Sequence, residues 1–156
     1  QVVSVTFLDQ DGEIRTRTRE EIEAQYRSVP ELHQSYALSA VFRGEPSSGD
    51  EIREKMVESK SHRRQSQPLA ASAGCIFKNP DGIGAGKLID EMGLKGRSVG
   101  MAEVSHEHGN FIVNRGKANA EDVLQLIEEI RLEAKDQRGI NLETEIQIVG
   151  EDRAVF

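Results

Sequence analysis

The chain has 156 residues, 37% of them hydrophobic, which is typical of one globular domain, or of one domain with part of another. Its 20 Lys and Arg against 27 Asp and Glu give a net charge of −7, which excludes a general affinity for nucleic acids. No apolar run approaches the roughly 18 residues that span a membrane, and no signal-peptide pattern opens the chain. A single cysteine, Cys75, excludes an internal disulfide and favours a cytoplasmic protein.

Alternating apolar and polar residues near the N-terminus predict strands. Residues 2–8 alternate, turn residues follow at 9–12, and a second run covers 13–17, so we predict a hairpin. A third alternating run covers 36–42, and the Gly, Pro and Ser of 44–49 then break the pattern, as in a linker. The strand pattern starts almost at the first residue, without an initiator methionine, and we interpret the sequence as a piece of a longer protein.

Two capping boxes predict helices. The box at residues 18–21 predicts a short helix over 19–27, and the box at 48–51 predicts a charged helix that ends near Arg64. The last turn of the second helix is basic. Basic residues there complement the helix dipole, and they also suit a phosphate contact.

The rest of the chain mixes strands and helices without a regular βαβ alternation, so we predict the α+β class. Asn119 and Gly139 are the expected cap and stop of the clearest helix. The predicted elements are an extended run around 75–77, a helix at 85–92, strands at 99–104 and 110–114, a helix at 120–138 and a last strand at 143–149.

A glycine-rich segment at 81–88 fails the patterns of known nucleotide loops. Asp81 and Leu88 stand where a Walker A loop has glycine and Ser or Thr, and Lys87 stands at the third glycine of a dinucleotide fingerprint. We interpret the segment as a loop that leads into a helix. His106 and His108 have the alternate spacing of metal ligands, but two ligands make no site, so we predict none.

Three features together suggest chemistry on a carbanion. Cys75 follows Gly74, which allows close approach of the backbone, and a cation, Lys78, and an amide, Asn79, lie within four residues. Glu145 is an acid on the predicted last strand, and Arg27 ends the predicted helix over 19–27. A proton donor, an acid and a cation are what stabilising and protonating a carbanion require. A lone Cys is also, by default, an inert core residue.

Four motifs in order carry a resemblance to a known family. They resemble the C-terminal, substrate-binding domain of the UDP-N-acetylenolpyruvoylglucosamine reductase (MurB) family, and the motifs cover residues 72–80, 85–96, 102–114 and 142–150. The resemblance implies that residues 46–156 form an α+β domain of mixed sheets and helices. It implies that residues 1–45 are a small β-rich remnant, the tail of an FAD-binding domain.

The resemblance implies a UDP-N-acetylmuramate dehydrogenase of peptidoglycan precursor synthesis. NADPH is the reductant, FAD carries the hydride, and UDP-N-acetylglucosamine enolpyruvate is the substrate. Carried over residue by residue, the proton donor is Cys75, where relatives have serine, and its catalytic partners are Glu145 and Arg27. Substrate contacts fall on Tyr26, Arg63, Arg64, Lys78 and Asn79.

The sequence departs from the family pattern in three places. Thr144 replaces a proline before Glu145, and Gln147 stands where arginine is common. The glycine-rich elements that hold FAD are missing, so we expect the chain by itself to be inactive, with FAD bound mainly by the rest of a longer chain. Two alternatives remain open: a non-catalytic UDP-sugar-binding module, and half of a fusion with a degenerate flavin domain. A phosphate-loop nucleotidase is a distant third.

Overall fold

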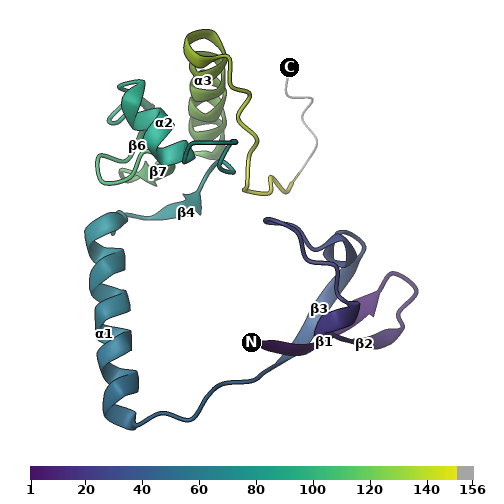
Figure 1. Cartoon of the computed structure of the whole chain (residues 1–156). Helices are drawn as coiled ribbons and strands as arrows, with labels where there is room; N and C mark the ends of the chain where they lie inside the picture. The colour runs from purple at the N-terminus through teal and green to yellow at the C-terminus, as the bar shows by residue number, and fades with distance from the viewer. Residues whose placement is uncertain (151–156) are drawn as a thin grey trace. The chain divides into compact units, whose positions relative to one another are not determined.

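The computed structural model describes residues 1–150 of the chain (Figure 1). The chain forms two compact units, Gln1–Glu54 and the residues from Lys55 onward. Helices and antiparallel sheets occur together without parallel βαβ units, which confirms the α+β prediction. In residues 1–150 no helix is long and apolar enough to cross a membrane.

The first unit is built on a three-stranded antiparallel sheet of order β2-β1-β3. The strands β1 (Val2–Asp9), β2 (Ile14–Thr18) and β3 (Ser35–Phe42) confirm the predicted hairpin and third strand. The Asp9 carboxylate accepts the Asp11 and Glu13 N–H groups, and Gly12 takes a left-handed φ of 82°. The hairpin turn is therefore held by one side chain and one glycine.

The helix predicted over residues 19–27 is wrong. The capping box of Thr18 and Glu21 is present, but it opens only the 3-10 turn η1 (Arg19–Glu21). Ile22 is already extended and is the one buried residue of the predicted helix, so too little apolar surface is available to hold further turns against the sheet. A second 3-10 turn, η2 (Pro30–His33), leads into β3.

The predicted charged helix is α1 (Gly49–Ser66), and it has no buried residue. Ser48 accepts the Glu51 N–H and Glu51 accepts the Ser48 N–H, so the predicted capping box fixes its first turn. The helix carries Arg63 and Arg64 in its last turn, as predicted.

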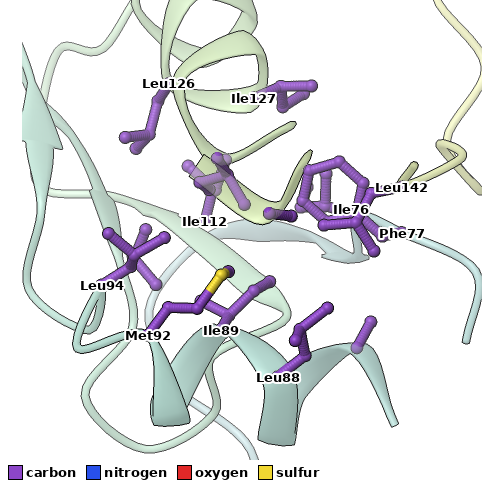
Figure 2. Close-up of a cluster of buried hydrophobic side chains, with 14 of the residues drawn as sticks. Ile76, Phe77, Leu88, Ile89, Met92, Leu94, Ile112, Leu126, Ile127 and Leu142 are labelled. Atoms are coloured by element: carbon purple, nitrogen blue, oxygen red, sulfur yellow. The ribbon is translucent and has the colours of Figure 1, made fainter. Parts of the chain in front are cut away.

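The second unit packs two helices and a four-stranded antiparallel sheet around one core (Figure 2). The sheet has the order β4-β7-β6-β5, and Ala102, Val104 and Ile112 point from it into the core. After α1, the elements of the second unit are β4 (Ser72–Cys75), α2 (Ala85–Glu91), β5 (Ser98–Val99), β6 (Ala102–Val104), β7 (Phe111–Asn114) and α3 (Ala120–Arg138).

The long helix α3 begins and ends where the sequence predicts. The Asn119 side chain accepts the Asp122 N–H, and Gly139 ends the helix at a φ of 67°. Its apolar stripe includes Leu126, Ile127 and Ile130, which belong to the core. Leu126 and Ile127 are labelled on this helix in Figure 2.

Two strand predictions need correction. The strand predicted over 99–104 is a hairpin of β5 and β6, because Gly100 turns the chain at a φ of 53°. The strand predicted over 143–149 is wrong, since only a single bridge forms there, between Phe77 and Thr144. Ile146 packs against the core, but Ile148 is exposed, so the alternation of this segment does not mark one continuous buried face.

Candidate functional site

The candidate site lies where β4 runs into residues 76–79. Cys75 ends β4 opposite Phe111 of β7, and a register shift separates this pair from the pair of Ser72 and Val113. Gly74 supplies the left-handed φ of 85° that this bulge needs. Cys75 is half-buried, so its thiol is neither in the core nor fully in solvent.

Residues 143–145 lie beside this segment. The Lys78 N–H donates to the Glu143 carbonyl and the Glu145 N–H donates to the Ile76 carbonyl, both at 2.8 Å. These bonds flank the bridge of Phe77 and Thr144. Glu145 is therefore the cross-strand neighbour of the residue that follows Cys75, although 70 positions of sequence lie between the thiol and the carboxylate. A thiol and a half-buried carboxyl are thus brought to neighbouring segments of the chain.

The departure at Thr144 does not disturb this pairing. Both backbone bonds around the bridge come from the N–H groups of Lys78 and Glu145, and neither uses the Thr144 N–H. A proline at this position would therefore remove neither of these hydrogen bonds. The presence of threonine in place of proline thus changes none of the hydrogen bonds that hold Glu145.

A buried asparagine holds the same segment from its other side. The Asn110 side chain accepts the Phe77 N–H at 2.9 Å and donates to the Phe77 carbonyl at 2.8 Å. Its backbone carbonyl accepts the Ile76 N–H at 2.9 Å. With 3% of its surface exposed, Asn110 makes these bonds out of reach of solvent. Residues 76 and 77 are therefore fixed by hydrogen bonds on both sides.

His108 is held in one orientation beside this asparagine. The Asn110 backbone N–H lies 3.1 Å from His108 Nδ1, and since a backbone N–H only donates, Nδ1 accepts and Nε2 carries the proton. The ring meets Phe111 edge-on, with 4.9 Å between centroids. A Cβ atom added at Gly86 would lie 2.6 Å from His108 Cε1, so only glycine allows this contact.

Burial lowers the pKa of His108, and the charge of Lys95 lowers it further. The folded state therefore binds its proton less readily than the unfolded state, where the pKa is about 6.5. The contribution of His108 to the free energy of unfolding should therefore be fully present above pH 6.5 or so. It should be lost as the pH drops from about 6.5 towards the lowered pKa. Urea unfolding at pH 7.5 and at pH 5 tests this. Between these two pH values the free energy of unfolding should fall less for His108→Gln than for the parent. An equal loss in both would contradict the assignment to His108.

Lys78 and Asn79 both have partners within the protein. Lys78 Nζ lies 3.1 Å from a carboxylate oxygen of Glu143, its cross-strand neighbour. Asn79 Oδ1 accepts the Ala85 N–H at 3.0 Å, at the first residue of α2. Their contact with a substrate stays a prediction, and their position beside Cys75 and Glu145 agrees with it.

The two predicted arginines of α1 differ in their surroundings. Both are exposed, and Arg64, unlike Arg63, is among the residues that line a pocket shared with the β6–β7 loop. The sequence predicts the same substrate contact for Arg63 and Arg64. In the structure, Arg64 shares a pocket with other charged side chains, which favours Arg64.

Tyr26 and Arg27 belong to the first unit, where they form the tip of a tight turn. Gln25 and Ser28 exchange two backbone hydrogen bonds, and the two residues between them are exposed. The Arg27 guanidinium carbon lies 5.8 Å from the centre of the Tyr26 ring. Arg27 takes a φ of 57°, which is uncommon for a residue other than glycine and concentrates at functional positions.

Sequence patterns gave neither Asn110 nor His108 a role in holding residues 76 and 77, and they treated His108 only as a possible metal ligand. Both lie in or next to the loop between β6 and β7, where neither strand alternation nor helical spacing marks a buried face. The available signal is the pair of glycines that they need, Gly86 and Gly109, because a Cβ at Gly109 would lie 2.6 Å from the Gly86 carbonyl oxygen. Such close approaches cannot be inferred from one sequence.

The glycine-rich turn at 82–86 does not fit a flavin pyrophosphate. His108 fills the space beside Gly86, and Asn79 accepts the Ala85 N–H. The turn is therefore closed by the protein's own side chains. We assign no described residue to FAD, and among residues 1–150 no group of three His, Cys, Asp or Glu side chains could hold a metal ion.

Comparison with known proteins identifies this arrangement. A family model described as UDP-N-acetylenolpyruvoylglucosamine reductase, C-terminal domain, matches residues 66–149. Reductases of this name from Agathobacter rectalis and Bacillus licheniformis are 46% and 42% identical to the chain, over 96% and 97% of its length. The crystal structure of UDP-N-acetylenolpyruvylglucosamine reductase (MurB) from Thermus caldophilus matches with a TM-score of 0.80 and 38% identity, over 94% of the chain.

The chain covers different shares of these proteins. It spans 48% of the Agathobacter rectalis relative, 52% of the Thermus caldophilus chain and 84% of the Bacillus licheniformis relative. The chain thus spans about half the length of most of the relatives named here. The resemblance found in the four motifs is confirmed.

Proposed function

Because this chain belongs to the UDP-N-acetylenolpyruvoylglucosamine reductase C-terminal domain family, we propose that it is the substrate-binding part of such a reductase. The family is one of oxidoreductases. The substrate is UDP-N-acetylglucosamine enolpyruvate, and the product serves peptidoglycan precursor synthesis in the cytoplasm. The observation that carries the proposal is the pairing of residues 143–145 with residues 76–78, which brings Glu145 next to the strand of Cys75.

In the proposed reaction the enolpyruvyl double bond gains a hydride and a proton. The family resemblance assigns the hydride to FAD, which NADPH reduces, and we assign neither cofactor to a residue of this chain. Cys75 holds the proton on its thiol and transfers it to the carbon next to the carboxylate. The resulting thiolate takes up a proton from solvent, which restores the donor.

Glu145 and Arg27 stabilise the charge that develops before this proton arrives. The Arg27 guanidinium is a permanent cation suited to the carboxylate of the enolpyruvyl group. Glu145 serves in its protonated form, or through a shared proton, because an ionised carboxylate would repel an enolate.

The same proposal divides the chain by task. Residues 1–45 are the tail of an FAD-binding domain, and residues 46–156 are the substrate-binding domain. Tyr26, Arg63, Arg64, Lys78 and Asn79 contact the nucleotide sugar. The rest of a longer chain supplies FAD to the site.

Activity of the complete gene product tests the proposal. With NADPH, it should reduce UDP-N-acetylglucosamine enolpyruvate, whereas the 156-residue chain should show neither this activity nor stoichiometric flavin absorbance. Asn79→Ala in the complete protein should weaken substrate binding by about tenfold or more, measured by calorimetry. Asn141→Ala, an exposed change in the same unit, is the control. Binding of the nucleotide sugar without any reduction would leave only a binding module.

A further inference from the structure

The loop between β6 and β7, residues 105–110, supports the candidate site from two sides. On one side, Asn110 binds the backbone of Phe77, two residues after Cys75. On the other side, the loop packs against the start of α2, the helix whose first N–H group binds the Asn79 side chain. One loop therefore contacts both the segment that follows the proton donor and the helix that orients a predicted substrate contact.

The contact between this loop and α2 is closer than ordinary packing. A Cβ atom at Gly86 would lie 2.6 Å from His108 Cε1 and 3.0 Å from His108 Nδ1. A Cβ atom at Gly109 would lie 2.6 Å from the Gly86 carbonyl oxygen and 3.3 Å from the Asp90 nitrogen. In proteins a Cβ atom hardly ever comes within 3.0 Å of such an atom, so both positions need glycine. The loop thus lies directly on the backbone of α2.

His108 is held firmly where it meets Gly86. Its N–H donates to the Ser105 hydroxyl at 3.3 Å, and its carbonyl accepts the Phe111 N–H at 3.0 Å. Its Nδ1 accepts the Asn110 N–H at 3.1 Å. Ser105 is only 1% exposed, so the bond to its hydroxyl is shielded from solvent. The imidazole ring therefore cannot turn away from Gly86 without breaking its bond to Asn110.

The first turn of α2 sets the orientation of the Asn79 side chain. Asn79 Oδ1 accepts the Ala85 N–H at 3.0 Å. Because a backbone N–H only donates, the amide oxygen faces the helix and the orientation of the amide is fixed. Helix α2 has seven residues, too few for a helix to be stable without packing. Its buried side chains hold one face in the core, and His108 holds the backbone of its second residue, Gly86.

We infer that His108 positions Asn79 for the substrate by fixing the first turn of α2. His108 is a positioning residue, because it acts through Gly86 and the Ala85 N–H. The inference rests on the proposed function for the contact between Asn79 and the nucleotide sugar. The two supports of the loop then have different effects: His108 sets substrate affinity, whereas Asn110 sets the position of Cys75.

Gly86→Ala in the complete protein tests the inference. The added methyl group must displace either His108 or the start of α2, so the affinity for UDP-N-acetylglucosamine enolpyruvate should fall by about three- to tenfold in calorimetry. KM should rise by a similar factor, whereas kcat should change less, because the bonds of Asn110 to Phe77 remain. Gly44→Ala is the matched control, since a Cβ atom there meets no heavy atom within 4 Å in the part of the chain that the structure describes.

A double-mutant cycle separates positioning from a general loss of stability. If the contact acts through Asn79, Gly86→Ala should weaken binding in the parent but not in the Asn79→Ala background. A purely structural defect would lower the affinity by the same factor in both backgrounds. His108→Asn is a second variant: its amide oxygen can still accept the Asn110 N–H, but the ring beside Gly86 is gone. It should also weaken binding only where Asn79 is present, and adding Gly86→Ala to it should cause no further loss.

Hydrogen exchange of the Ala85 amide gives a readout that does not depend on activity. In Gly86→Ala and in His108→Asn this proton should exchange faster than in the parent, because its bond to Asn79 is weakened. An unchanged exchange rate, or equal losses of affinity with and without Asn79, would overturn the role of His108. Reduction of the enolpyruvyl substrate by the complete protein would then still stand. Conversely, faster exchange and an Asn79-dependent loss of binding, in a protein that does not reduce the substrate, would support the positioning role and remove the proposed reaction.

Discussion

Replacing Cys75 with alanine is expected to reduce substrate turnover by about 10²–10⁴-fold in the complete enzyme, because general acid catalysis typically contributes that much. The enolate formed after hydride addition would have to take its proton from solvent. Reduction of the enzyme by NADPH in the absence of substrate, thermal stability and UDP affinity should stay unchanged, because none of them uses the thiol proton. Stopped-flow measurements of the two half-reactions separate these effects.

Cys75→Ser provides the matched control for the same experiment. A hydroxyl keeps a transferable proton and nearly the volume of the thiol, so this variant should keep substantial activity. A thiol, with an ordinary pKa of about 8.5, is protonated at neutral pH and is more acidic than a hydroxyl, so the parent should remain the faster enzyme. If Cys75→Ala turns over at the parental rate, Cys75 is only a small packing residue, and Glu145 becomes the first candidate for the donor.

Asn110→Ala is expected to lower the free energy of unfolding by about 2–5 kcal/mol, because it leaves both the N–H and the carbonyl of buried Phe77 without a partner. Each orphaned buried group costs about 1–3 kcal/mol. Asn141→Ala should cost less than about 0.5 kcal/mol, since Asn141 is exposed in the same unit. Urea unfolding of both variants measures the difference.

The Asn110 change should also reach the candidate site, because Phe77 lies midway between Cys75 and Asn79. Where Asn110→Ala remains folded, substrate turnover should fall more than UDP affinity does, since the hydrogen bonds of Asn110 to Phe77 set the position of Cys75. Asn110→Asp offers a second test: the carboxylate would keep the acceptor but lose the donor to the Phe77 carbonyl. If Asn110→Ala were as stable as the Asn141→Ala control, water or backbone movement would have replaced the hydrogen bonds between the Asn110 side chain and Phe77.

Elements whose start and stop are encoded locally could be predicted from the sequence. The boundaries of α1 and α3 follow from side chains within three residues of each end, and the hairpin of β1 and β2 follows from Asp9 and Gly12. The same local signal failed at residues 19–27. A capping box satisfies the first N–H groups of a helix, but it cannot supply the apolar contacts that hold the following turns.

The candidate site could be predicted only as residue types. The motifs indicate Cys75 and Glu145. The proximity of these two residues depends on a single bridge at Thr144, in a segment for which the sequence pattern predicts a strand of seven residues. Asn110 carries no local signal, because its partners are backbone atoms 33 positions away.

The pairing of residues 76–78 with 143–145 also has a consequence for folding during synthesis. The Lys78 and Glu143 partners are 65 positions apart, so this contact closes a long loop and forms late. Consider a growing chain in which residues up to Asn110 have left the ribosome but Glu145 has not. Asn110 can then bind residues 76 and 77, while the side of this segment that pairs with residues 143–145 is still open to solvent. The Glu145 and Lys78 amide protons should accordingly be the last at this site to gain protection in pulse-labelled hydrogen exchange.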